Sequence, residues 1–475
     1  MKQNNRTRLS ALCTVLFLTG CGTLAPDYVR PQQPVPAHVN GSARSQAAVG
    51  FDVSNIGWRE VFTDSRLQQV IATALGNNRD LRVALLNIEQ ARAQYRIQRA
   101  ALLPEVDLSA SQNVGRSSAS TSQSGRSDVS RVYSADIGIS SWELDIFGRL
   151  RSLNEEALQT YLSTEQAQRA TRLSLVAEVA DAWLTVGAYR SRLDLSSQTL
   201  ANQQQVLRLT QFRRERGTAS GLEVSQAQTS VETARGDVAS TRTELAKARN
   251  ALELLVGAPV SDALLPGSLA ENDAGIALIA IPEALDSTAL LQRPDVLQAE
   301  HTLQAANANI GAARAAFFPT ISLTASTGRA STELNELFRG GNGTWSFVPS
   351  ITVPIFQGGA LRAQLDVSKI QTRIEVAEYE KAIQTAFSEV ADALAEREQL
   401  QERLDAQRAL VVSSQRSYDL ANARYRTGIV SFLEALDSQR SLYAAQQTQI
   451  DLYLVEASNR VLLFKALGGG ADARP

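Results

Sequence analysis

Few side chains in this 475-residue chain could carry covalent or metal chemistry. The only cysteines and histidines are Cys13, Cys21, His38 and His301, and the two histidines lie far apart in the sequence. A His/Cys metal site therefore has almost no ligands to draw on. His301 falls in a helical stretch, where we expect a surface or interhelical residue. The segment GGGAD at 468–472 follows a helix and not a strand, so it does not predict a phosphate-binding loop. The sequence predicts no enzyme, no metal site and no bound cofactor.

The charge balance narrows the choice of partners. Lys and Arg total 47, Asp and Glu total 49, and the formal net charge is −2. Because no basic block stands out, we expect no nucleic acid as a partner.

Cys21 is the one residue for which the sequence predicts a covalent modification. Cationic residues within 1–8 precede the short apolar run 9–18, which is the order of a secretory signal peptide. The run is about half the ~20 residues that a helix needs to span a bilayer. It ends in Leu18-Thr19-Gly20-Cys21, which resembles the lipobox of bacterial lipoproteins. We therefore expect a signal peptide at 1–20 and a diacylglycerol and N-acyl lipid on Cys21; the alternative is an incidental cysteine after an ordinary signal. By the same resemblance, Gly22 in place of Asp indicates sorting to the outer membrane.

The positions of the prolines predict four very long helices. Four of the thirteen prolines fall within 26–36, which indicates an extended linker, and none occurs in 105–258 or in 355–474. Both proline-free blocks are rich in helix formers, and in the first block apolar residues recur at steps of three and four. The expected long helices span about 148–216, 219–256, 358–426 and 431–467.

The chain also contains an internal duplication. RAALLPEVDLSAS at 99–111 matches RAAFFPTISLTAS at 314–326, and RERGTASGLEVSQAQ at 214–228 matches YRTGIVSFLEALDSQ at 425–439. The second match aligns Gly217 with Gly428, and we expect these glycines to form the turns of two helical hairpins. Each half then consists of a helix, a β-hairpin and two long helices.

Each half contains two segments in which apolar and polar residues alternate, joined by a polar loop. The resulting β-hairpins are expected at about 105–143 and 320–356. Amphipathic segments of roughly ten residues with aromatic residues near their ends are typical of outer-membrane β-barrels. The alternative is a pair of amphipathic hairpins on a soluble core.

Four strands cannot close a barrel, and an open sheet edge within lipid would leave backbone groups without hydrogen bonds. Copies of the chain must therefore share one barrel. Two copies give eight strands, which side chains would largely fill, whereas three give twelve and leave a channel. Four long helices from each of three chains would similarly give twelve.

These features resemble the outer-membrane factor family, which includes TolC and the OprM/NodT lipoproteins. The resemblance covers roughly 22–470 and is most specific in YRTGIVSFLEALDSQRSLYAAQ at 425–446. It implies a mixed α+β membrane protein: a homotrimer with a shared 12-stranded β-barrel, continued through the periplasm by a 12-helix α-barrel. Its implied partners are a periplasmic membrane-fusion adaptor, an inner-membrane RND transporter and the lipid of the outer membrane. The expected segments are the signal peptide 1–20, a lipidated Pro-rich linker 21–57, repeats 58–257 and 294–468, an equatorial connector 258–293 and a tail 469–475.

The resemblance also implies a gate at the periplasmic tips of the helical hairpins. It assigns the constriction to Leu433, Glu434 and Asp437, with Tyr425 and Arg426 as latching partners. A ring of leucines could close by dewetting, and a ring of aspartates would favour cations. The alternative is an ordinary helix N-terminus with favourably placed acids. The first repeat has Gln226 where the second has Asp437, so only one hairpin per chain supplies that ring. The TolC branch has an arginine where this chain has Val430, so its latch must differ in detail.

The function implied is that of a passive exit duct that expels drugs or other small toxic compounds. A type I secretion channel and a metal-efflux channel are alternatives within the transport class. A lipid-anchored periplasmic coiled-coil protein without a pore is an alternative from another class. A membrane-associated hydrolase is a distant third, because no nucleophile–base pair is present.

Overall fold

The computed structural model describes residues 22–39, 57–120, 125–269, 275–277 and 285–469. The expected signal peptide and Cys21 lie outside these residues. The chain divides into two compact units. The first comprises residues 1–32, 87–165 and 298–379, and the second comprises 33–86, 166–297 and 380–475.

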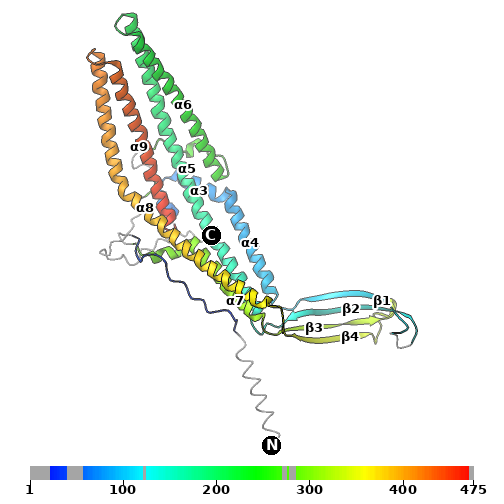
Figure 1. Ribbon diagram of the computed structural model, residues 1–475. Helices are drawn as coiled ribbons and strands as arrows, with labels where there is room; N and C mark the ends of the chain where they lie inside the picture. Colours follow the sequence, from blue (N-terminus) through cyan, green and yellow to red (C-terminus); the bar gives the residue numbers. More distant parts are fainter. Residues whose placement is uncertain (1–21, 40–56, 121–124, 270–274, 278–284, 470–475) are drawn as a thin grey trace. The chain divides into compact units, whose positions relative to one another are not determined.

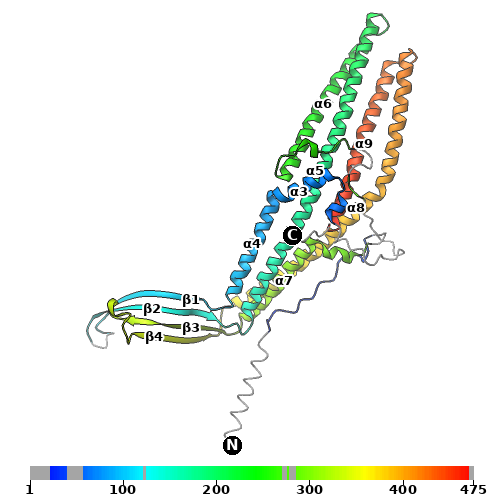
Figure 2. The same cartoon turned by 180° about the vertical axis from the view of Figure 1, so that it is seen from behind.

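One antiparallel sheet of four strands belongs to the first unit (Figures 1 and 2). Its strands, in sheet order, are β1 (Val106–Ser117), β2 (Asp128–Glu143), β3 (Thr320–Ser331) and β4 (Gly343–Thr352). The two expected hairpins are thus joined edge to edge by pairing between β2 and β3. The second hairpin ends at Thr352, four residues before its expected limit and two residues before Pro354.

Alternation along the strands gives this sheet two different faces. Residues that pair across the strands share a face, and one such row runs through Leu108, Ile137, Thr327 and Trp345. Three of these four side chains are large and apolar. That face is open: Leu108 is 81% exposed and Trp345 is 80% exposed. The opposite face is rich in small polar residues, and hydroxyl–hydroxyl hydrogen bonds cross it between Ser111 and Ser134, Ser322 and Ser350, and Ser326 and Ser346.

An extended segment packs on a helix of the first unit. Residues after Gly22 lie along α7 (Pro294–Ala315), where Arg314 donates to the carbonyl of Leu24 and Asn307 donates to that of Pro26. Glu300, only 4% exposed, accepts a two-pronged hydrogen bond from Arg30 at 2.8 Å and another from Tyr28 Oη at 3.2 Å. Burial, followed by the Glu300 carboxylate, raises the pKa of Tyr28. The proline-rich linker is therefore anchored at a buried acid.

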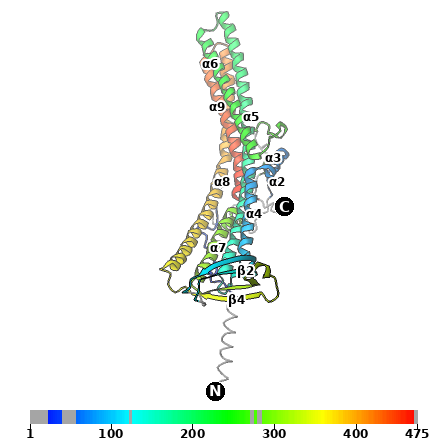
Figure 3. The same cartoon turned by 90° about the vertical axis from the view of Figure 1, so that its right-hand side faces the viewer.

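Long helices occur where the prolines are missing. They are α5 (Arg149–Glu215), α6 (Gly221–Val256), α8 (Ala360–Arg426) and α9 (Phe432–Ala466), each within two residues of the expected bounds. In the second unit α5 and α6 form one hairpin and α8 and α9 form another, with both turns at the same end (Figures 1 and 3). The remaining elements among the described residues are α2 (Trp58–Val61), α3 (Ser65–Asn77), α4 (Arg79–Ala100) and the short 3₁₀ turns η2 (Asp262–Leu264), η3 (Ser287–Gln292) and η4 (Leu334–Glu336).

The main core of the second unit gathers apolar residues from α3, α5, α6 and α9 around Phe62, Trp183 and Phe464. At its edge Arg293, 5% exposed, donates to Asp295, to Glu389 and to the carbonyl of Ala466. Burial disfavours the charged guanidinium, but the bonds to the two acids outweigh burial and raise the pKa of Arg293. One arginine thus ties α8 to the end of α9. Within the described ranges, no helix is both apolar and long enough to cross a bilayer.

Candidate functional site

The two helical hairpins turn with the same backbone geometry. Gly217 and Gly428 have φ of +73° and +79°, the left-handed region that favours glycine. In the first turn Thr218 N–H donates to Arg213 O, and in the second Ile429 N–H donates to Arg424 O, so both helices end in a Schellman-type cap. Ser220 and Ser431 then cap the next helix by accepting from the backbone N–H of Glu223 and Glu434. The duplication predicted from the sequence therefore extends to individual hydrogen bonds.

Tyr425 lies in a buried cluster where the two hairpins meet. It is 6% exposed and packs with Ala421, Phe432, Ala435 and Leu436 of its own hairpin and with Ala227 of α6. The Tyr425 and Phe432 ring centroids are 5.3 Å apart. The Arg213 guanidinium of α5 lies 4.9 Å from the Tyr425 ring centroid, within the range of a cation–π contact. Tyr425 Oη is buried and has no hydrogen-bond partner among the described residues.

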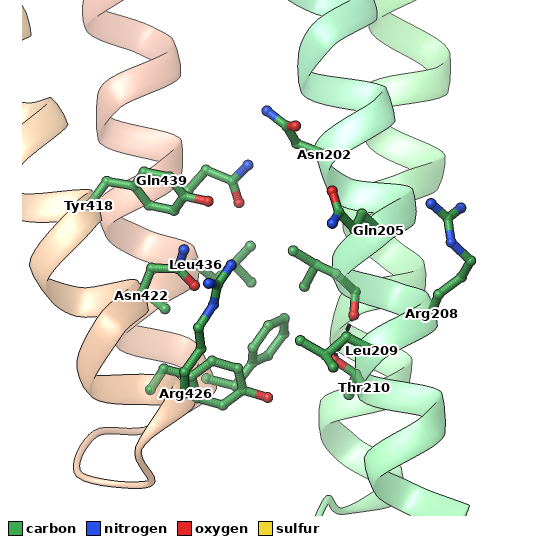
Figure 4. A pocket seen from close by; sticks show the side chains of 14 residues that line it. Asn202, Gln205, Arg208, Leu209, Thr210, Tyr418, Asn422, Arg426, Leu436 and Gln439 are labelled. Carbon is green, nitrogen blue, oxygen red and sulfur yellow. Dashed lines mark hydrogen bonds between the residues drawn. The ribbon is translucent and has the colours of Figure 1, made fainter.

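Arg426 lines a cavity of about 460 Å³ beside this cluster. Figure 4 shows Tyr418, Asn422 and Arg426 of α8 on one side of the cavity and Asn202, Gln205 and Leu209 of α5 on the other. Gln439 of α9 also lines it, and its amide oxygen accepts a 2.7 Å hydrogen bond from Gln203 of α5. Polar side chains therefore surround a space between the hairpins, next to an apolar contact.

Leu433, Glu434 and Asp437 lie in a separate groove on the α8–α9 hairpin. The groove also contains a row of serines: Ser413, Ser414, Ser417, Ser431, Ser438 and Ser441. Leu433 is 49% exposed, and the Asp437 side chain is 62% exposed with Arg440 Nη1 3.6 Å away. The five residues assigned to the gate thus form two groups. Tyr425 and Arg426 contribute to the contact between hairpins, whereas Leu433, Glu434 and Asp437 line an open groove.

The residues that complete the contact between the hairpins carry no signal in the sequence that identifies them as partners. Arg213 precedes the first turn much as Tyr425 precedes the second, but nothing in the repeat indicates that they meet. Gln203 has no sequence signal at all, although Gln439 belongs to the LDSQR motif. His301 Nδ1 lies 2.8 Å from Gln159 Oε1, as expected of an interhelical residue, and burial lowers its pKa.

The sheet and the hairpins are those of an outer-membrane efflux channel, and comparison with known proteins supports this class. The model of the family described as outer membrane efflux protein matches residues 70–258 and 285–469. The toluene efflux pump outer membrane protein TtgC of Pseudomonas putida is 49% identical over 470 residues, covering 98% of this chain and 96% of TtgC. The cation efflux system protein CusC of Escherichia coli is 42% identical over 463 residues, covering 98% of this chain and 99% of CusC.

Solved structures of outer-membrane channels also match this chain. The open state of the MtrE outer membrane channel of Neisseria gonorrhoeae superposes with a TM-score of 0.84 at 38% identity, covering 96% of this chain and all of that one. The crystallised CusC gives a TM-score of 0.86 at 40% identity, covering 94% of this chain and all of that one. The chain belongs to the outer membrane efflux protein family. It is an efflux channel of the outer membrane, a transport component of a pump complex, and its family is one of channels and not of enzymes.

Proposed function

We propose that three copies of this chain form one exit duct of a tripartite efflux pump. Each copy contributes four strands to a 12-stranded barrel in the outer membrane and four long helices to a 12-helix barrel in the periplasm. The duct is passive, binds no cofactor, and takes its driving energy from an inner-membrane RND transporter through a periplasmic adaptor protein.

The sheet carries this proposal. Its apolar face is exposed although it holds Leu108, Phe347 and Ile351, and water is a poor environment for such a surface. Strands β1 and β4 are the sheet edges, so each edge needs a partner. Joining β1 of one copy to β4 of the next satisfies both edges, turns the apolar face towards lipid and leaves the serine-rich face to line a water-filled lumen.

The hairpin tips supply the gate in this proposal. Leu433, Glu434 and Asp437 of three copies surround the periplasmic entrance, where a leucine ring can exclude water and an aspartate ring attracts cations. Tyr425 and Arg426 act as a latch between the two hairpins of each chain. Opening requires the hairpins to move apart at the cluster around Tyr425, because that contact joins them at the tip.

We further propose that Cys21 carries the lipid. Gly22 and Thr23 lie against Gly148, just before α5, so a lipid on Cys21 would be attached close to the strand ends. Mass spectrometry of the purified protein tests this proposal: the mature chain should begin at Cys21 with acyl chains attached, and Cys21→Ser should lack them. An unmodified thiol at Cys21 would contradict it.

The substrates proposed are organic solvents and antibiotics. Relatives at 49% identity are named for toluene and antibiotic efflux. A second candidate is cation efflux, because CusC is 42% identical and named for it. The sequence has a single methionine and two cysteines, so it offers few of the sulfur ligands that soft metal ions prefer, and this favours the organic substrates.

Conductance across planar lipid bilayers tests the duct and its gate together. The wild type should show single-channel conductance with a preference for cations, and Asp437→Asn should reduce that preference. Gln226→Asn is the matched control, because Gln226 holds the same place in the first repeat and carries no charge. Absence of conductance would contradict the duct, and an unchanged ion preference in Asp437→Asn would contradict the acidic ring.

A further inference from the structure

Three arginines lie on the apolar face of the sheet near the loops that join β1 to β2 and β3 to β4; we call this end of the strands the loop end. Arg116 of β1 pairs with Val129, and Arg131 of β2 pairs with Val114, so both share a face with Leu108 and Ile137. Arg329 of β3 pairs with Ala135 on the same face and stands at the last paired position between β3 and β4. Each β-hairpin therefore finishes its apolar face with a cation.

None of the three arginines is neutralised by a carboxylate within the part of the chain that the structure describes. Arg116 Nε donates to the Ser127 hydroxyl at 2.9 Å, and Arg329 Nη1 donates at 2.9 Å to the carbonyls of Phe338 and Arg339. Hydroxyl and carbonyl oxygens accept these bonds but leave the positive charge uncompensated. Arg131 is exposed, with no hydrogen bond or ion pair inside the described ranges.

The nearby acids do not alter this imbalance. Asp128 pairs with Ser117 and so belongs to the polar face, while Glu336 is bound by Arg339. Glu333 is exposed in the loop after β3. The other end of the strands differs, since there Arg149 pairs with Glu143 and Arg151 pairs with Asp145. Among the arginines of the sheet itself, positive charge without a carboxylate partner therefore lies at the loop end.

The side chains on this face follow the order of a membrane interface. Apolar residues give way to Tyr133 and Trp345, which combine an apolar ring with a polar group. Arg131 follows Tyr133 two residues further along β2, and Arg329 of β3 pairs with Gly343, two residues beyond Trp345 on β4. Aromatic residues of this kind mark the boundary between hydrocarbon and headgroups in membrane barrels. The arginines then stand at the depth of the headgroups.

We propose that Arg116, Arg131 and Arg329 bind the phosphate groups of a phosphorylated glycolipid in the outer leaflet. A guanidinium presents a planar set of donors that matches phosphate oxygens, and its stem can lie along apolar surface while the head reaches the phosphate. This inference rests on the proposed barrel, because only there does the apolar face meet lipid. It adds a lipid-binding site at the outer rim, separate from the gate.

Lipid binding by the purified, delipidated complex in detergent tests the inference. The probes are a diglucosamine lipid with two phosphates and the same lipid after phosphate removal, and each is titrated while thermal unfolding is followed. Juxtamembrane arginines contribute about five-fold each to binding of anionic lipid, so replacing all three by Gln should weaken binding of the phosphorylated lipid on the order of 100-fold. Binding of the lipid without phosphate should not change.

Two controls separate the site from charge in general. Asp128→Asn changes the charge near the same loop end but on the polar face, and Arg99→Gln removes a cation from α4; both should bind as the wild type does. Equal binding of the two lipids by the wild type, or wild-type affinity in the triple variant, would overturn the inference. If the triple variant does not assemble, each single variant should still lose about five-fold, and no loss in any of them would overturn it as well. Conductance in phosphate-free lipid reports on the duct alone, so either proposal can fail without the other.

Discussion

Replacing Tyr425 by Ala should open the channel at the periplasmic tip. The substitution removes the cation–π contact with Arg213, which contributes about 0.5–1 kcal/mol. It also loosens the apolar cluster that includes Ala227 and against which Val206 and Leu207 of the other hairpin pack; at about 0.8 kcal/mol per buried methylene, we take this loss as ~1 kcal/mol. A loss of about 2 kcal/mol per chain corresponds to a shift of roughly 30-fold in the ratio of open to closed hairpin pairs. Single-channel recording should therefore show Tyr425→Ala open for a much larger share of the time than the wild type.

Tyr425→Phe is the matched control, because the Tyr425 hydroxyl is buried without a partner among the described residues. Phe keeps the ring, its contact with Phe432 and its contact with Arg213, so gating should stay close to that of the wild type. Arg213→Gln should have an intermediate effect, because it removes the cation–π contact alone. If Tyr425→Ala assembles normally and gates as the wild type does, the latch assignment is wrong. If Tyr425→Phe opens the channel as strongly as Tyr425→Ala, the ring contacts are not what closes it.

Three further outcomes follow from the geometry. Gly428→Ala places a side chain at φ of +79°, which should cost about 1 kcal/mol and lower the unfolding temperature, whereas Ala at Gly236, inside α6 with open space around it, should not lower it. Arg30→Ala leaves the buried Glu300 with Tyr28 as its one remaining partner from the N-terminal segment; since Arg30 is half exposed, we expect a loss of about 1–2 kcal/mol, seen as earlier proteolysis of that segment. The hydrogen bond from Arg66 lowers the pKa of Asp64 in the folded protein below its ordinary value of 3.8. The ionised Asp64 therefore contributes its full stability above pH 3.8, and this contribution is lost as the pH falls through the lower pKa of the folded state. Unfolding temperatures measured from pH 7 down to about 3 should fall more steeply for the wild type than for Asp64→Asn.

Elements governed by local sequence could be predicted closely. Proline is disfavoured in helix interiors, so its absence from 105–258 and 355–474 indicated where α5, α6, α8 and α9 lie. A left-handed turn favours glycine, and the repeat therefore identified Gly217 and Gly428. Period-two alternation likewise placed the two β-hairpins, because the apolar face of each strand has to be continuous.

Contacts between distant segments could not be predicted. Nothing local shows that β2 pairs with β3, that Arg213 of the first hairpin reaches Tyr425 of the second, or that Glu300 binds the segment around Arg30. Each of these contacts depends on how elements far apart in the sequence pack together, and no local pattern in a single sequence indicates that packing. The arginines at the loop ends were visible in the sequence, but their shared face became clear only from the register of the strands.

Native mass spectrometry of the complex extracted from outer membranes measures how many chains form one pore. Because four strands per chain cannot close a barrel, we expect a particle with three times the mass of the mature lipidated chain, which persists when the protein is diluted in detergent. A stable monomer or dimer that still conducts ions in a bilayer would contradict it.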